Sequence, residues 1–144
     1  GNLLCADAGG TSLDLSLVVD GKGWVNSTFE LEFDLHVNAL STDVITLGAG
    51  GGSIVSIAPT GEVRVGPDSA GADPGPACYG QGGINPTTTD TALLIGILDP
   101  DGFLGGALRL DPEKSRQAFE RLDSPLSTDQ LIRHAWGMGV HNAA

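Results

Sequence analysis

The stretch DAGGTSLD, Asp7–Asp14, lies between two apolar runs, Leu3–Ala6 and Leu13–Val19, whose composition is typical of β-strands. Two adjacent glycines at such a junction favour a tight turn, because glycine adopts positive φ without strain and has no Cβ to block an approaching ligand. Backbone N–H groups in a turn of this kind can point into one concavity and bind an anion. The sequence therefore predicts a β-hairpin whose bend can approach a ligand closely.

The polar side chains around these glycines are compatible with two interpretations. Thr11 and Ser12 supply hydroxyl groups, and Asp7 and Asp14 supply hard oxygens suited to Mg²⁺ with its shell of waters. One interpretation is a hairpin that binds phosphate and magnesium. The other is an ordinary Gly-Gly hairpin with solvated acids, and these eight residues favour neither.

The composition indicates one folded domain over residues 1–144, with 40% apolar residues and a mean hydropathy of +0.07. The net charge of −11 argues against nucleic acid and anionic membranes, because both need clustered basic residues. The negative charge is compatible with nucleotide binding if a divalent metal ion mediates it.

Two cysteines without a CxxC pair, and no charged-then-apolar leader, favour a soluble, cytoplasmic protein. A strand begins almost at once and a helical pattern runs to Ala144, so we expect a piece of a larger protein.

Further strands follow the hairpin in the sequence. Trp24–Phe33 alternates with a period of two and is expected to complete an antiparallel meander over residues 3–33. Leu35–Ser41 has no clear pattern. Val44–Leu47 predicts another short strand, and the segments on either side of Pro59-Thr60-Gly61 predict a second hairpin, Ile54–Ala58 with Glu62–Val65.

A second glycine-rich run, Gly48–Ser53, lies between these predicted strands. Strands on both sides make it a poor linker, so we expect a second place where the backbone meets a ligand, with Ser53 as a hydroxyl donor. The alternative is a flexible loop tip. The run does not satisfy GxGxxG, because Ser53 replaces the last glycine, and the sequence contains no GxxxxGK[ST]. A P-loop or dinucleotide-binding fold is therefore disfavoured.

The second half of the sequence predicts an ordered loop over Gly66–Gly83, followed by helices. Thr87–Asp90 is expected to cap a helix over Thr91–Leu98; capping is the favoured role of Asp90, and metal binding is an alternative. Asp111 and Pro112 open a helix to about Leu122, and a third helix begins at Ser127 or Thr128. Strands first and helices last favour an α+β or mixed-sheet architecture, with the antiparallel meander at the N-terminus.

Taken together, these motifs resemble the hydantoinase A/5-oxoprolinase family. The matching segments are DAGGTSLD, GAGGGSI (Gly48–Ile54), GPDSAGADPGPACYGQGG (Gly66–Gly83), PTTTDTALLIG (Pro86–Gly96) and LDPDGFLGGALRLD (Leu98–Asp111). DxGGT alone is a weak signal, but the long run at Gly66–Gly83 is unusual. The sequence departs from the family pattern at Ala8 and Leu13, where a larger apolar residue and a threonine are common.

The resemblance implies a ribonuclease-H-like half of an actin/Hsp70/sugar-kinase ATPase fold. It implies ATP-dependent activation of a cyclic amide or ketone oxygen by phosphoryl transfer, with Mg²⁺ or Mn²⁺ and with a hydantoinase B-type subunit or domain as partner. By this analogy Asp7 is catalytic and Asp7 and Asp14 hold the metal. The residues that would bind the nucleotide are Gly9, Gly10, Thr11 and Ser12, with Gly50, Gly51, Gly52 and Ser53.

The family has a second DxGGT hairpin, which these residues lack, so the isolated chain is expected to be inactive. Two other functions remain as alternatives. Cys78 could act as a nucleophile from an ordered loop, although no His or Lys lies near it in the sequence to lower its pKa. The chain could instead be a non-catalytic module that packs its glycine-rich surfaces against another subunit.

Overall fold

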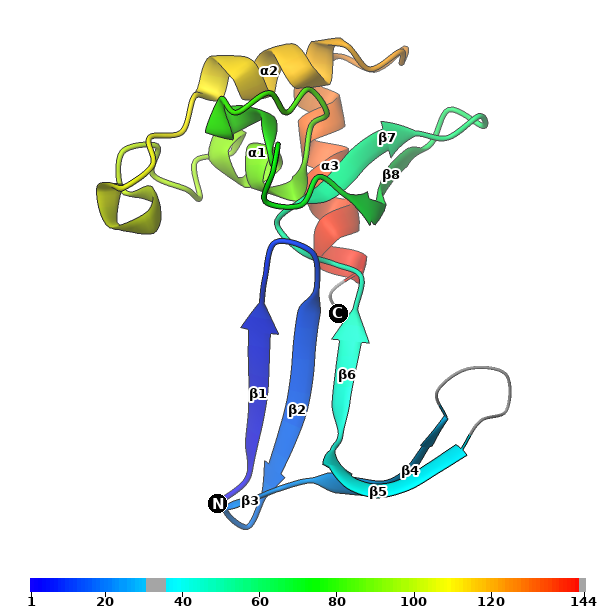
Figure 1. The fold of residues 1–144 in the computed structure, drawn as a ribbon. Helices are drawn as coiled ribbons and strands as arrows, with labels where there is room; N and C mark the ends of the chain where they lie inside the picture. The colour runs from blue at the N-terminus through cyan, green and yellow to red at the C-terminus, as the bar shows by residue number, and fades with distance from the viewer. Residues whose placement is uncertain (31–35, 143–144) are drawn as a thin grey trace.

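The structure, a computed structural model, describes residues 1–30 and 36–142. Strands fill the first half of the chain and helices the second (Figure 1). The strands are β1 Leu3–Ala8, β2 Leu13–Val19, β3 Lys22–Gly23, β4 Val25–Glu30, β5 His36–Thr42, β6 Val44–Leu47, β7 Ser53–Ile57 and β8 Val63–Ser69. The helices are η1 Ala77–Tyr79, α1 Thr88–Leu94, η2 Phe103–Gly106, α2 Pro112–Glu120 and α3 Thr128–Asn142.

The predicted hairpin around the two glycines is confirmed. Strands β1 and β2 pair antiparallel from Leu3 opposite Val18 to Ala8 opposite Leu13. The other edge of β2 is shared by β6, which pairs near the glycines, and by the two-residue β3 at the far end. All strand pairings in the described part of the chain are antiparallel, so these residues form an α+β arrangement without the parallel pairing of a mixed sheet.

The prediction that Trp24–Phe33 forms the third strand of a meander is wrong. Beyond β3 the chain leaves the sheet, and β4 pairs with β5 in a separate two-stranded ribbon, while β6 takes the place beside β2 (Figure 1). The end of the predicted strand, residues 31–33, lies outside the described residues. A period of two indicates that a segment is extended but does not specify its partner, so the pattern could not separate a meander from a ribbon.

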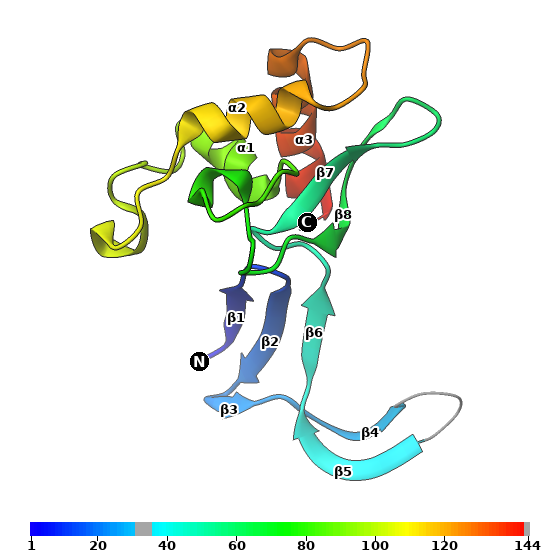
Figure 2. The same ribbon diagram turned by 45° about the horizontal axis from the view of Figure 1, so that its top comes forward.

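The two faces of the β1–β2–β6 sheet differ because successive side chains alternate between them. One face carries Leu4, Leu15, Leu17 and Ile45, and two of these are strongly exposed, Leu4 at 66% and Ile45 at 59%. The other face carries the carboxylates next to the glycines. In Figures 1 and 2 the sheet extends away from the helices and meets them at its glycine end.

The hydrophobic core lies between the β7–β8 hairpin and the helices (Figure 2). Its buried members come from both strands and from α2 and α3: Val55, Val65, Phe119, Leu131, Ile132 and Ala135. The predicted second hairpin and the helices that begin at Pro112 and Thr128 are confirmed. No helix within the described ranges is long and apolar enough to cross a membrane.

Helix α1 begins at Thr88, three residues earlier than predicted, and ends at Leu94 instead of Leu98. The reason is a reciprocal capping box. Thr87 is the N-cap and its hydroxyl accepts from the N–H of Asp90, while the Asp90 carboxylate accepts from the N–H of Thr87. Asp90 is therefore the third residue of the helix, and its predicted capping role is confirmed through this capping box.

The Asp90 carboxylate also orders the loop before α1. It is fully buried and accepts from the backbone N–H groups of Ala77 and Cys78 at 3.1 and 2.8 Å and from the Ser115 hydroxyl at 2.6 Å. With the N–H and hydroxyl of Thr87, five donors converge on two oxygens. A carboxylate offers about four lone-pair sites, so this network excludes a metal role for Asp90. The predicted loop over Gly66–Gly83 is only partly confirmed, because its first residues, through Ser69, belong to β8.

Cys78 lies in this network and is fully buried. Burial raises the pKa of its thiol well above the ordinary value, and the nearby Asp90 charge raises the pKa further. A thiol nucleophile must be accessible and readily ionised, so the interpretation of Cys78 as a catalytic nucleophile is wrong.

We predict that Asp90→Asn destabilises the fold by roughly 3 kcal/mol, because the new amide turns an NH₂ group toward buried N–H and O–H donors, which then lose their acceptor. Urea unfolding followed by circular dichroism measures the change. Asp123→Asn, on an exposed residue, is the matched control. An equal unfolding midpoint for both variants would contradict this role.

We predict that iodoacetamide at about pH 9 labels Cys5, which is exposed, and leaves Cys78 unlabelled until urea unfolds the chain. Mass spectrometry of tryptic peptides reads the two sites separately. Because the folded pKa of Cys78 is raised, the free energy of unfolding should fall as the pH rises above the ordinary thiol pKa. Equal labelling of both cysteines in the native chain would refute the prediction.

Candidate functional site

The bend of the first hairpin, Gly9–Ser12, is closed by one hydrogen bond from the N–H of Gly9 to the carbonyl of Ser12, at 2.8 Å. Gly9, Gly10 and Thr11 are exposed. The N–H groups of Gly10 and Thr11 have no acceptor among the described residues. Two neighbouring free N–H groups at an exposed bend are the donors that an anion requires.

The two carboxylates beside the bend lie together. Asp7 on β1 is the direct cross-strand partner of Asp14 on β2, so both side chains are on the same face. The Thr46 hydroxyl donates to one oxygen of Asp14 at 2.6 Å, and the Ser12 hydroxyl lies 3.5 Å from the other. Like charges directly opposite destabilise a strand pair, and a bound cation relieves that repulsion.

The acidic pair suits Mg²⁺ better than a metal that needs a full cage of protein ligands. No group of three or more His, Cys, Asp or Glu gathers as a metal site in the part of the chain that the structure describes. Mg²⁺ is usually bound through one or two carboxylates together with waters and substrate phosphates. Asp7 and Asp14 fit that requirement.

The second glycine loop, Gly48–Ser53, packs against the bend. The N–H of Gly51 donates to the carbonyl of Gly9 at 3.1 Å, and the N–H of Gly52 donates to the carbonyl of Gly10 at 2.5 Å. Within the loop, the N–H of Gly50 donates to the Ser53 hydroxyl and the N–H of Ser53 donates to the carbonyl of Gly50. The structure thus brings all the predicted nucleotide-binding residues together, with the four N–H groups of residues 50–53 already donating inside the chain.

Close backbone contact explains the glycines at positions 50 and 52 of this loop. A Cβ on Gly50 would lie 2.6 Å from the carbonyl carbon of Thr11, and a Cβ on Gly52 would lie 2.7 Å from the carbonyl oxygen of Gly10. Backbone atoms cannot give way as a flexible side chain can. The interpretation of the run as a flexible loop tip is therefore wrong.

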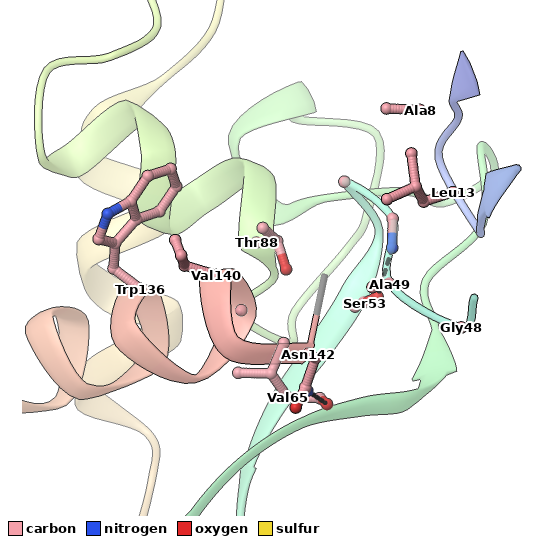
Figure 3. A pocket seen from close by; sticks show the side chains of 13 residues that line it. Ala8, Leu13, Gly48, Ala49, Ser53, Val65, Thr88, Trp136, Val140 and Asn142 are labelled. Atoms are coloured by element: carbon pink, nitrogen blue, oxygen red, sulfur yellow. Dashed lines mark hydrogen bonds between the residues drawn. The ribbon is translucent and has the colours of Figure 1, made fainter. Parts of the chain in front are cut away.

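A cavity of about 260 Å³ lies next to both glycine-rich segments (Figure 3). Ala8 and Leu13 line it from the hairpin, and Trp136 and Val140 line it from α3. Ala8 and Leu13 are neighbours in sequence of the acidic residues, so their side chains lie on the opposite face of the hairpin from Asp7 and Asp14. The apolar cavity and the acidic pair are separate features of the site.

One residue of the site, Thr89, could not be identified from the sequence. The N–H and the hydroxyl of Thr89, in the first turn of α1, both donate to the carbonyl of Gly51 at 2.8 Å. The run Thr87-Thr88-Thr89 signalled a helix start, but hydroxyl residues in a row do not indicate which one reaches another segment.

Comparison with known proteins places the chain in a family. A model of the hydantoinase/oxoprolinase family matches residues 1–144. The chain is 40% identical over 129 residues to the caprolactamase subunit alpha of Pseudomonas jessenii, a match that covers 87% of this chain and 18% of the relative. It is 39% identical over 133 residues to the acetophenone carboxylase gamma subunit of Aromatoleum aromaticum, covering 90% of this chain and 18% of the relative.

A solved structure agrees with this assignment. The crystal structure of the ATP-dependent caprolactamase from Pseudomonas jessenii superposes with a TM-score of 0.78 at 34% identity, over 99% of this chain and 21% of that chain. The chain therefore spans about a fifth of the length of these relatives. Because the family model covers every residue and the fold agrees, the chain belongs to the hydantoinase/oxoprolinase family.

Proposed function

We propose that these residues are the ATP-binding portion of an enzyme that activates a cyclic amide, or a ketone, by ATP-dependent phosphorylation. The observation that carries the proposal is the exposed bend, with free N–H groups on Gly10 and Thr11 next to the paired carboxylates of Asp7 and Asp14. The relatives support the chemistry, since one is named an ATP-dependent caprolactamase and another a carboxylase of acetophenone.

In this proposal the bend holds the phosphates. The N–H groups of Gly10 and Thr11 donate to phosphate oxygens, Gly9 leaves room for their approach, and Ser12 adds a hydroxyl. Asp7 and Asp14 hold Mg²⁺ or Mn²⁺, which neutralises charge on the transferring phosphate when bound. Gly51 and Gly52 fix the bend through their N–H groups, and Gly50 and Ser53 hold the loop in shape by donating to each other.

The proposal extends to the parent protein. The relatives are several times longer than this chain, which supports residues 1–144 as one domain of a larger chain. The resemblance of the glycine-rich motifs favours a ribonuclease-H-like half of an actin/Hsp70/sugar-kinase-type ATPase fold. Two relatives are named as subunits, which supports a partner subunit; the family resemblance implies that this partner is of the hydantoinase B type. The acidity of the chain favours a small substrate over nucleic acid.

A non-catalytic assembly module is the second candidate. The observation that favours it is the apolar face of the β1–β2–β6 sheet, on which Leu4 and Ile45 are strongly exposed. Exposed apolar area of this kind is typical of surfaces that pack against other polypeptide. Unlike the ATP-binding function, this one does not require the carboxylates near the bend.

We predict that Asp7→Asn in the full-length protein lowers kcat for ATP hydrolysis by about 10²- to 10³-fold, because one of the two metal-binding charges is lost. A coupled phosphate-release assay measures the rate. Asp20→Asn is the control, because Asp20 lies at the far end of the same hairpin with φ of 51°, which asparagine tolerates. Unchanged activity in Asp7→Asn would favour the assembly module.

We predict that the isolated chain of residues 1–144 hydrolyses essentially no ATP even with saturating Mg²⁺. The reason is that in-line phosphoryl transfer needs groups positioned on both sides of the phosphates, and this chain supplies one acidic hairpin. Steady-state phosphate release from the purified chain tests this, with the full-length protein as the positive control. Robust Mg²⁺-dependent turnover by the isolated chain would contradict it.

A further inference from the structure

Thr89 joins the start of α1 to the second glycine loop. Its side-chain hydroxyl and its backbone N–H both donate to the carbonyl oxygen of Gly51, each at 2.8 Å. The residue is 8% exposed. The first N–H groups of a helix have no partner within the helix, and the N–H of Thr89 is one of them. The hydrogen bond to Gly51 therefore supplies this N–H with an acceptor and also holds Gly51 in place.

Gly51 in turn holds the bend. Its N–H donates to the carbonyl oxygen of Gly9 at 3.1 Å, so a single residue connects Thr89 to the first glycine of the bend. The neighbouring N–H of Gly52 donates to Gly10. The connection from α1 to the bend thus consists of hydrogen bonds to backbone atoms, with no flexible side chain other than the Thr89 hydroxyl.

The contacts along this connection are tight. A Cβ on Gly51 would lie 2.8 Å from the Thr89 hydroxyl oxygen, and a Cβ on Gly50 would lie 2.6 Å from the carbonyl carbon of Thr11. Segments packed this closely pass a displacement to their neighbour instead of absorbing it. A shift of Gly51 therefore moves the bend.

The helix itself is rigidly placed. The residue after Thr89 is Asp90, whose buried carboxylate accepts from donors in the η1 loop and from Ser115 of α2. The start of α1 is thus fixed by the helical part of the chain. Through Gly51 it provides a fixed support for a hairpin that otherwise extends away from the helices (Figure 1).

We propose that Thr89 is a positioning residue for phosphoryl transfer, which acts by holding Gly51 so that the N–H groups of Gly10 and Thr11 are fixed in direction. This inference rests on the proposed function for the bend, and it adds a residue from another element to that site. Thr89 acts through Gly51 and is not itself a ligand of the phosphates.

The test compares three variants of the full-length protein. Thr89→Val keeps the size of the side chain and removes the hydroxyl, and Thr89→Ser restores a hydroxyl. Thr91→Val is the matched control, because the Thr91 hydroxyl is also buried in α1 but donates to the carbonyl of Thr87 and not to the second glycine loop.

The first measurement is amide hydrogen exchange, which does not depend on ATP. Thr89→Val should speed exchange at the N–H groups of Gly51 and Gly52 several-fold, while Thr89→Ser and Thr91→Val leave it unchanged. The second measurement is the ATPase rate, in which Thr89→Val should lower kcat by about 10- to 100-fold and change KM for ATP by less than about twofold. Thr89→Ser should recover most of the rate.

The outcomes separate this inference from the function on which it rests. Unchanged exchange in Thr89→Val, or equal losses in Thr89→Val and Thr91→Val, would overturn the positioning role. Faster exchange confined to Thr89→Val, in a protein whose unsubstituted form hydrolyses no ATP, would support the structural link and refute the proposed function. Faster exchange with a kcat loss that serine restores would support both.

Discussion

Two backbone hydrogen bonds between glycine-rich segments, from Gly51 to Gly9 and from Gly52 to Gly10, fix the bend of the first hairpin to the rest of the molecule. The β1–β2–β6 sheet extends away from the helices and meets them at this end (Figures 1 and 2). Without these bonds the exposed bend would be free to move. Only residues without a Cβ allow the two backbones to approach this closely, because a Cβ on Gly50 or Gly52 would overlap backbone atoms.

The helical part of the chain is organised by a single buried charge. Asp90 accepts five hydrogen bonds, from η1, from the N-cap of α1 and from α2. These bonds join segments that are far apart in the sequence. Five donors offset the cost of burying a carboxylate. The adjacent Thr89 uses the placement of this helix to hold Gly51. The order imposed at Asp90 therefore extends to the bend, and the Gly66–Gly83 run has a structural role in support of the site.

The sequence predicted the parts of the site that follow from local rules. Paired glycines between two apolar runs indicated the hairpin, and the alternation of a strand places Asp7 opposite Asp14 once the bend lies at Gly9–Ser12. The helix at Pro112 followed from its Asp-Pro start. The errors arose where pairing is long-range: Trp24–Phe33 was expected to join the first sheet, but β6 occupies the edge of β2 there.

By itself, then, the sequence determined the hairpin, its acidic pair, the order of strands and helices, and the resemblance of its motifs to the family. Each of these depends on residues that are close together in the chain. Only the tertiary structure decided what the second glycine loop does. Its composition indicates close approach by something, but whether that is a ligand or another stretch of backbone depends on which segments the fold brings together. The fold brings the loop to the bend, where the N–H groups of Gly51 and Gly52 donate to Gly9 and Gly10, while those of Gly10 and Thr11 have no acceptor in the part of the chain that the structure describes.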